Sequence, residues 1–519
     1  MNEDETGSSA DSAADRNPLF EGGGPLADPL ERRAIFAALD SFRQYRKTTH
    51  YNTTHRRRQN LYALPSAQWQ MLAAPPISLL DTLSAVDDAI DCNADLADAI
   101  YEVGLASFGL SDDEETPSST ATKQHNPNWN WHGQAKPNDI SKAQSTIRQF
   151  YRDWTAQGFA LEVQPLLNMI LADLEMYLPI RPKPRPDVDT TTTESQSHNN
   201  RNHHSDDFSS SPSLLLPGAG LGRILFELCL HGYSATGNEI SYHQLLASNF
   251  ILNCTRHADQ FAIYPFAHSF TNVRARARAQ CARAEQTARH EQSQTETATD
   301  EQSHTQTDTE VPVPVGEMNM TAGDFVLSYS GFDTASTFDG VVSVFFIDTA
   351  PNLIRYIETV KNCLKQGGYW INIGPLLWHF DDRAPSSQST SLTSGPKGAG
   401  SNNNNNKNSS DDDDDNEDNS PNPNDKIETN NGQDYEDKGI AEPGSFELSV
   451  DQVLCLVSKL GFEVLRHEIV ATDTAAAADQ DHPNPSSGST SSPGLGYMQD
   501  PESLLQNRYR CSHWVARKL

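Results

Sequence analysis

The feature that most constrains this chain is a glycine-rich stretch, residues 214–223, between an apolar run and a helical pattern. Three leucines and a proline lead into glycines at every second position, Gly218, Gly220 and Gly222. This order predicts a strand, a tight turn and a helix with free N–H groups at its start. Glycines in such a turn allow positive φ and let a ligand approach the main chain. A purely structural βα turn is the alternative explanation.

An acidic residue follows at a spacing that nucleotide-binding folds use. Glu239 comes 21 residues after Gly218, at the end of a second short predicted strand, where a carboxylate binds ribose hydroxyls. A dinucleotide fingerprint would place its third glycine at position 223, where this chain has Arg223. The observed G-x-G-x-G spacing is typical of S-adenosylmethionine (SAM) methyltransferases. A nicotinamide-dependent oxidoreductase stays open as an alternative at this point.

Strand and helix patterns alternate along the second half of the chain. Residues 338–348 predict a strand buried on both faces, a helical pattern follows over 352–364, and residues 369–373 predict another strand. Such alternation is typical of a parallel sheet with crossover helices. We therefore expect the α/β class, with a Rossmann-like, mostly parallel, doubly wound sheet of the SAM-dependent methyltransferase type.

Low-complexity segments divide the 519 residues into parts that fold and parts that do not. We expect a disordered N-terminus (1–30), a helical region (31–182) of which residues 141–178 pack on the cofactor site, a disordered linker (183–212) and the Rossmann-like domain (213–519). Asn-, Asp-, Gln- and Ser-rich inserts interrupt this domain at about 274–310, 381–443 and 471–496.

Four polar residues are predicted at the carboxyl ends of the strands, where doubly wound sheets bind ligands: Glu239, Asp324, Asp348 and His379. Asp348 ends the buried run 338–348, so its carboxylate can hold one nitrogen of a neutral imidazole or amine. Capping the next helix is the alternative role for Asp348. For His379, the alternative is an ordinary loop histidine.

Composition limits the partners that we expect. A net charge of −31 argues against nucleic acid as the main partner, although the basic segment 45–58 leaves contact with nucleic acid as an alternative to a solvated helix face. The seven cysteines include no C-x-x-C pair, which predicts neither a zinc site nor a disulfide framework. No apolar run reaches about 18 residues and the acidic start lacks a signal-peptide pattern. We expect a cytoplasmic protein without a membrane span; nuclear access and a homodimer stay open.

Several strings resemble the carnosine N-methyltransferase family, which is built around an N2227-like domain. They include residues 145–154, 217–223, 345–350 and 367–380. The resemblance extends over most of the ordered chain from about 141 to 517. It implies SAM as cofactor and methylation of an imidazole nitrogen in a small histidine-containing dipeptide, such as carnosine, which gives anserine.

The resemblance also implies roles at matching positions. The implied cofactor-binding residues are Gln149, Arg152, Gly218, Gly220, Gly222, Glu239, Asp324, Phe325 and Val344. Pattern alone explains Gln149 and Arg152 as a surface pair on an amphipathic helix. The implied substrate-binding residues are Asp348, His379 and Tyr509, with Asp348 catalytic and no metal involved. The family commonly has histidine at the position of Pro351 and cysteine at that of Val344.

Asp348 would select the imidazole tautomer and stabilise the charge that develops during methyl transfer. A neutral imidazole is already a nucleophile at pH 7, so positioning would be the main contribution of the protein. Three competing functions stay open: a methyltransferase for protein histidine or another small N-nucleophile, a nicotinamide-dependent oxidoreductase, and an inactive binding module that uses the acidic inserts as interaction tails.

Overall fold

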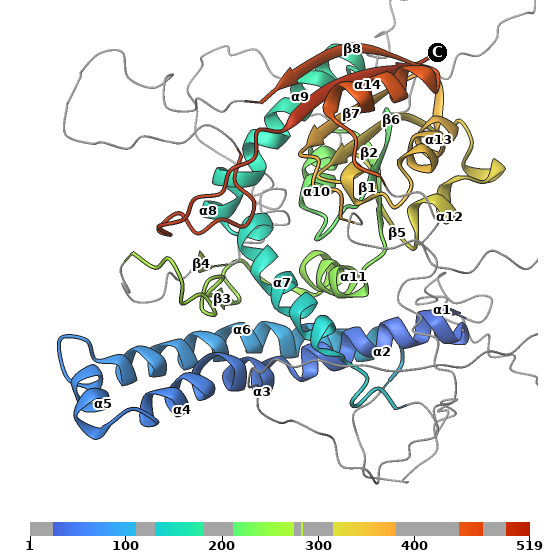
Figure 1. The fold of residues 1–519 in the computed structure, drawn as a ribbon. Helices are drawn as coiled ribbons and strands as arrows, with labels where there is room; N and C mark the ends of the chain where they lie inside the picture. Colours follow the sequence, from blue (N-terminus) through green and yellow to red (C-terminus); the bar gives the residue numbers. More distant parts are fainter. Residues whose placement is uncertain are drawn as a thin grey trace, which may run out of the picture.

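The computed structural model describes residues 24–110, 130–180, 211–274, 282–283, 315–379, 446–470 and 495–519. The predicted linker and the three predicted inserts lie almost entirely outside these residues, as do residues 1–23. A layer of long helices runs along one side of the molecule, and α7 joins it to the sheet and its covering helices (Figure 1). None of the helices in the described segments is both long and apolar enough to cross a membrane.

The described part of the N-terminal region is mainly helical. Its helices are α1 (Gly24–Ala27), α2 (Pro29–Arg43), α3 (Tyr45–His50), α4 (Arg56–Tyr62), α5 (Ser66–Ala73), α6 (Leu79–Ser107), α7 (Pro137–Trp154), α8 (Ala156–Gly158) and α9 (Gln164–Tyr177), with π-helical turns at Tyr51–His55 and Phe159–Val163. Residues 24–27 and 29–30 are helical, which corrects the prediction of disorder for all of 1–30. The Asp28 carboxylate accepts the Leu30 N–H at 2.7 Å and Pro29 occupies the first turn, so α2 has a complete N-terminal signal.

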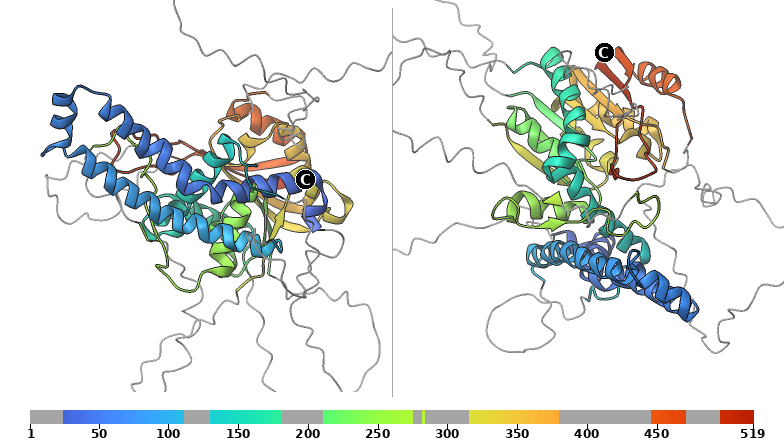
Figure 2. Two further views of the ribbon diagram at one scale, coloured as in Figure 1. Left: turned by 90° about the horizontal axis from the view of Figure 1, so that it is seen from below. Right: turned by 90° about the vertical axis from the view of Figure 1, so that its left-hand side faces the viewer.

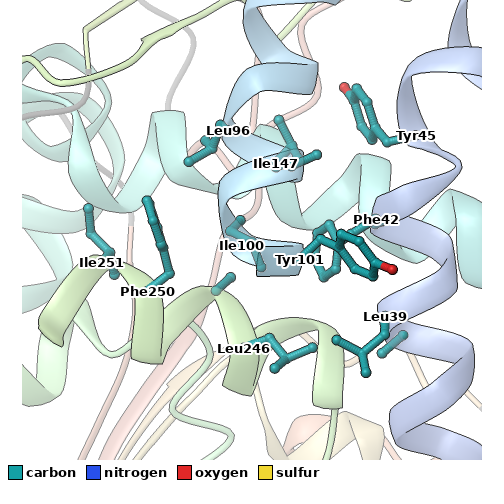
Figure 3. Packing of buried hydrophobic residues seen from close by; sticks show 14 of the residues in the cluster. Leu39, Phe42, Tyr45, Leu96, Ile100, Tyr101, Ile147, Leu246, Phe250 and Ile251 are labelled. Atoms are coloured by element: carbon teal, nitrogen blue, oxygen red, sulfur yellow. The ribbon is translucent and has the colours of Figure 1, made fainter. Parts of the chain in front are cut away.

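A hydrophobic cluster holds the helical layer together (Figure 3). Leu39 and Phe42 of α2 pack with Ile100 of α6 and Ile147 of α7, as the apolar periodicity of α2 predicts. The cluster also includes Leu246 of α11 (Tyr242–Asn249), which belongs to the sheet domain. Each such fully buried side chain contributes about 1.5–3 kcal/mol, so this cluster fixes the helical layer against the sheet domain.

The basic segment 45–58 faces acidic side chains of α6. The Arg46 guanidinium forms ion pairs with Asp91 at 2.6 Å, Asp95 at 2.7 Å and Asp98 at 2.8 Å. The views in Figure 2 show α2 to α4 running alongside α6, which brings these charges together. Arg58 likewise pairs with Asp87 at 2.6 Å, so two of the arginines in this segment have acidic partners within the protein.

The sheet has seven strands in the order β5-β2-β1-β6-β7-β9-β8. They are β1 (Ser213–Pro217), β2 (Ser234–Glu239), β5 (Met318–Ala322), β6 (Phe338–Val344), β7 (Leu364–Gly374), β8 (Phe462–Ile469) and β9 (Ser512–Lys518); β3 (Ala262–Ile263) and β4 (Ala282–Arg283) form a separate pair. Only β9 runs antiparallel to its neighbours in the seven-stranded sheet. The prediction of a mostly parallel Rossmann-like sheet is confirmed.

Helices cover both faces of the sheet because its central strands alternate their apolar side chains. Leu214 and Leu216 of β1 pack with α9 and α10 (Arg223–Leu230), whereas Leu215 packs on the opposite face. That face carries α12 (Phe325–Tyr329), α13 (Leu353–Cys363) and α14 (Val450–Lys459). A strand that is buried on both sides needs continuous apolar sequence, and this explains the leucine run before the glycines.

Candidate active site

A cavity of about 360 Å³ opens at the carboxyl ends of β1, β2 and β6, with α7 on one side. This is where doubly wound sheets bind ligands, and the volume lies within the range of about 300–1,000 Å³ for small-molecule sites. All the predicted cofactor-binding residues except Gly222 line it. The structure therefore brings together residues that lie far apart in the sequence, from α7 to the end of β6.

The glycine turn forms the floor of the cavity. Gly220 has φ +59°, and a Cβ atom there would lie 3.1 Å from both Gln149 Nε2 and Gln244 Oε1. Gly222 has φ +79° and immediately precedes α10, so it shapes the turn from behind the cavity. Both positions require conformations that other residues adopt only with strain.

Glu239 lies at the end of β2 with its carboxylate against the glycine turn. Its oxygens accept N–H groups from Gly220 at 3.0 Å, Ile240 at 2.9 Å and Ser241 at 2.8 Å. Burial raises the pKa of Glu239, while these three N–H groups act to lower it. A carboxylate has about four acceptor positions, so one is left for a hydroxyl group in the cavity.

The α7 side of the cavity holds a buried charge pair. Arg152 Nε lies 3.4 Å from an oxygen of Asp153, and the Arg152 guanidinium lies 4.6 Å from the centre of the Tyr497 ring. Burial raises the pKa of Asp153, while Arg152 and Arg223 act to lower it. Because Gln149 and Tyr497 line the same side, this end of the cavity offers a cation and an amide to an anionic group.

Aromatic rings form the opposite wall. Phe346 stacks on Tyr356 with ring centres 5.0 Å apart, and Phe325 meets Phe346 edge-on at 5.5 Å. A Cβ atom at Gly218 would lie 2.6 Å from the Phe346 ring, so this wall depends on that glycine. Asp324 lines the cavity and also caps α12, because its carboxylate accepts the Leu327 N–H at 2.9 Å.

Asp348 lies directly behind the cavity wall. It is 2 % exposed, and one carboxylate oxygen accepts the Leu377 N–H at 2.9 Å. Its own carbonyl accepts the N–H of His379, which lines the cavity. Burial raises the pKa of Asp348, while the Leu377 N–H and the nearby His379 act to lower it. Asn352, rather than Asp348, caps α13, because its side chain accepts the Arg355 N–H at 3.3 Å.

Tyr509 does not line the cavity but contacts a residue that does. Its ring meets Phe345 edge-on at 5.9 Å, and Phe345 stacks on Tyr497 at 5.1 Å. We expected Tyr509 within the last strand, but β9 begins only at Ser512, and Tyr509 instead pairs with Leu495. This pairing folds the segment 495–509 back beside the cavity.

Two residues near Asp348 have a strained backbone. Phe345 and Trp378 have φ values of +52° and +49°, which cost non-glycine residues about 1–3 kcal/mol each. Phe345 also ends β6 earlier than the strand predicted for 338–348. Strain of this kind persists at sites where the surrounding structure fixes the backbone for a functional reason.

Sequence reasoning missed several lining residues. Tyr497 follows a low-complexity segment and carries no motif, and Tyr356 is one apolar position among several on α13. Gln244 lies on α11, where the helical pattern does not indicate which face meets a cavity. Of the aromatic wall, the resemblance indicated Phe325, whereas Phe345 and Phe346 stood only within a matching string without an assigned role.

The cavity fits the expected cofactor, SAM, in three parts. Glu239 would bind the ribose hydroxyls, the wall with Phe325 and Tyr356 would hold the adenine, and Arg152 would meet the carboxylate of the amino-acid tail. SAM has no pyrophosphate, so the turn needs no third glycine at the position of Arg223. That guanidinium is instead paired with Glu227 at 2.6 Å behind the turn.

Comparisons with known proteins agree with this geometry. A family described as carnosine N-methyltransferase matches residues 193–519. A carnosine N-methyltransferase of Schizosaccharomyces pombe is 26% identical over 491 residues, 94% of this chain and 97% of that protein. The carnosine N-methyltransferase of Rattus norvegicus is 30% identical over 376 residues, 72% of this chain and 78% of that protein.

Among solved structures, a SAM-dependent methyltransferase from Methanosarcina mazei aligns with 60% of this chain and 94% of its own, at 14% identity and a TM-score of 0.27. The fold itself rests on the strand order and on the turn between β1 and α10. The match over residues 193–519 separates this chain from the nicotinamide-dependent oxidoreductases. The chain belongs to the carnosine N-methyltransferase family and is a SAM-dependent methyltransferase.

Proposed function

We propose that this enzyme methylates an imidazole nitrogen of a small histidine-containing dipeptide, with carnosine as substrate and anserine as product. The observation that carries the proposal is the Asp348 carboxylate. It is buried against the cavity wall, and within the described residues no side chain hydrogen bonds to it. A carboxylate in this state is suited to accept an N–H group from a neutral heterocycle.

Bound SAM supplies an electrophilic methyl group to this site. An imidazole with a pKa near 6.5 is mostly neutral at pH 7, with one N–H group and one free lone pair. Asp348 would accept the N–H, which would leave the lone pair of the other nitrogen free to attack the methyl carbon. The bond between that carbon and the sulfonium sulfur would break, with S-adenosylhomocysteine as the leaving group. The ring becomes cationic as the bond forms, and the carboxylate stabilises that charge. The N–H proton then leaves by way of Asp348 to solvent.

Asp348 must be ionised for this role, and its surroundings both raise and lower its pKa. Burial raises the pKa of Asp348, whereas the Leu377 N–H and His379 lower it. The Leu377 N–H binds the carboxylate of Asp348, and the His379 N–H binds its backbone carbonyl. In this proposal the segment 377–379 shifts slightly as the imidazole enters, and the strained φ of Trp378 favours such a shift.

Transfer of labelled methyl from SAM to carnosine tests the proposal, with homocarnosine and a longer peptide with an internal histidine alongside. We expect product from the two dipeptides and little from the longer peptide. Product from the longer peptide alone would favour the alternative, a methyltransferase for protein histidine. SAM binding without product on any of the three would overturn the proposed substrate class and leave the cofactor site in place.

A further inference from the structure

Arg148 is a cation without a partner beside the active site. It lies one helical turn before Arg152 on α7, and its Nε atom is buried without a hydrogen-bond partner. Nowhere in the described part of the chain does its guanidinium form a hydrogen bond or an ion pair. A partly buried charge in this state is unfavourable in the free protein, and an anionic ligand would remove that penalty.

A second unpartnered group, on His268, lies within the electrostatic influence of Arg148. The Tyr45 hydroxyl lies 3.4 Å from His268 Nε2, and His268 Nδ1 is buried without a partner among the described residues. Burial and the neighbouring Arg148 lower the pKa of His268 to about 4, so the ring is neutral at pH 7. With the hydroxyl donating to Nε2, the ring carries its hydrogen on Nδ1. Arg148 and His268 then both offer donors.

Arg148 adjoins the cavity through Tyr497. The charge of Arg148 acts on Tyr497, Glu162 and Tyr45, which places it among them. Tyr497 also lines the cavity and stacks on Phe345. Glu162 acts on Arg148 only at a distance and forms no ion pair with it, because its oxygens accept the N–H groups of Met498 and Gln499 at 2.6 and 2.8 Å.

Tyr497 connects Arg148 to both ends of the cavity. Its ring lies 4.6 Å from the Arg152 guanidinium and also stacks on Phe345, which meets Tyr509. Arg148 does not itself line the cavity that holds the glycine turn and Glu239, and Arg152 already supplies a cation there for the cofactor. An anion carried by the molecule that accepts the methyl group is therefore the better match for Arg148.

We propose that Arg148 and His268 form a subsite for the free carboxylate of a substrate that ends in histidine. The inference rests on the proposed function and names the feature that selects a dipeptide. In such a dipeptide the carboxylate and the imidazole belong to the same residue. An internal histidine of a protein has a neutral amide at that position and would leave the guanidinium unpaired.

The test compares carnosine with its C-terminal carboxamide in wild type and in Arg148→Gln. Wild type should prefer carnosine by about 10–100-fold in kcat/KM, the range for a hydrogen-bonded charged group. Arg148→Gln should lose that factor on carnosine and change less than about 3-fold on the carboxamide. Carnosine should also raise the unfolding temperature of wild type loaded with S-adenosylhomocysteine, and this rise should vanish in the variant.

Controls separate the subsite from the fold and from the cofactor site. Lys142→Gln removes an exposed cation from the same helix and should change neither kinetics nor ligand-induced stabilisation. Arg148→Gln without ligands should unfold at the same temperature as wild type or higher. If it does not fold, Arg148→Lys and His268→Gln provide the same comparison, with smaller selective losses on carnosine of about 3–10-fold.

Three results would overturn the inference while the proposed function stands: equal kcat/KM for the two substrates in wild type, equal losses on both in Arg148→Gln, or weaker SAM binding in that variant. The last would assign the guanidinium to the carboxylate of the cofactor. Turnover of neither substrate by wild type would overturn the proposed function, and the inference with it.

Discussion

The two ends of the cavity are built in different ways. The floor of the cofactor end comes from one contiguous unit, β1, the glycine turn, α10 and β2, all within residues 213–239, to which other elements add single side chains such as Arg152 and Phe325. The substrate end combines α7, the segments 345–349 and 377–379, and the segment 495–509, which long stretches of chain separate. The first end is held by ladder hydrogen bonds of the sheet, and the second by buried side chains and strained loops.

This difference indicates where specificity changes most easily. The cofactor end is tied to the central strands, so a substitution there alters backbone geometry as well as binding. The substrate end rests on contacts between loops, such as the stacking of Tyr497 on Phe345. Loops carried by a rigid sheet commonly hold the residues that select a substrate. We therefore expect substitutions at the cofactor end to change mainly SAM affinity, and those at the substrate end to change mainly turnover of the substrate.

The largest expected effect is at Asp348. Asp348→Ala should lower kcat by about 10²-fold or more, because it removes the charge that stabilises the imidazolium. SAM affinity, measured by calorimetry, should stay within about 2-fold, because the aspartate lies behind the cavity wall. Asp333→Ala, at an exposed aspartate outside the cavity, serves as the control. Turnover close to wild type in Asp348→Ala would remove the residue from the mechanism.

The next effect is at the cofactor end. Gly220→Ala should weaken SAM binding by about 10-fold and lower stability by about 1–2 kcal/mol, the cost of a side chain in the left-handed region. Its new Cβ would also press on Gln149 and Gln244, each 3.1 Å away. Calorimetry gives the affinity, and chemical denaturation gives the stability.

Gly367→Ala is the matched control for that substitution. Gly367 has φ +77° and nothing within 4 Å of a new Cβ, so it shares the backbone strain without the contact to the cavity. We expect a similar loss of stability and unchanged SAM affinity. If both variants weaken SAM binding equally, general destabilisation explains the effect and the glycine turn loses its special role.

A smaller effect is expected at Glu162, which ties the segment 495–509 to the cavity. Glu162→Gln replaces one of the two oxygens that accept the Met498 and Gln499 N–H groups. Tyr497 should then be held less firmly, so KM for carnosine should rise about 3–10-fold while kcat stays within about 3-fold. Glu463→Gln, in an exposed ion pair with Arg517, should change neither. A fall in kcat alone would show that Glu162 acts on chemistry rather than on position.

The same residue predicts the smallest effect, a pH dependence of stability. Burial raises the pKa of Glu162 in the folded chain. Between its ordinary value and the raised one, the folded chain therefore binds more protons than the unfolded chain, and unfolding free energy falls as pH rises through that window. Glu162→Gln removes this contribution. The unfolding free energy of wild type minus that of the variant should therefore fall as pH rises. Denaturation midpoints from pH 4.5 upward, about the ordinary glutamate value, measure it; a growing difference would contradict the sign.

The sequence predicted the cofactor end of the cavity better than the substrate end. Gly218, Gly220 and Glu239 act through local geometry, and local patterns indicated both the turn and the acid. The mostly parallel sheet also followed from local alternation of strands and helices. These features depend on neighbours within a few residues, so periodicity and spacing were enough.

The substrate end depends on packing between distant segments, which local patterns do not encode. An apolar run at 338–348 could not indicate that β6 stops at Val344, because the positive φ of Phe345 arises from its surroundings. Helical periodicity placed Gln149 and Arg152 on one face of α7 but did not indicate that Arg152 pairs with Asp153 while the neighbouring Arg148 is left without a partner. Tyr497 had no sequence signal at all.

The most direct test of the account is a crystal structure of the enzyme with S-adenosylhomocysteine and carnosine. We expect the ribose hydroxyls on Glu239, the imidazole N–H on Asp348 and the dipeptide carboxylate between Arg148 and His268. A dipeptide bound with its imidazole away from Asp348 would contradict the proposed chemistry, even if the cofactor lay where the glycine turn predicts.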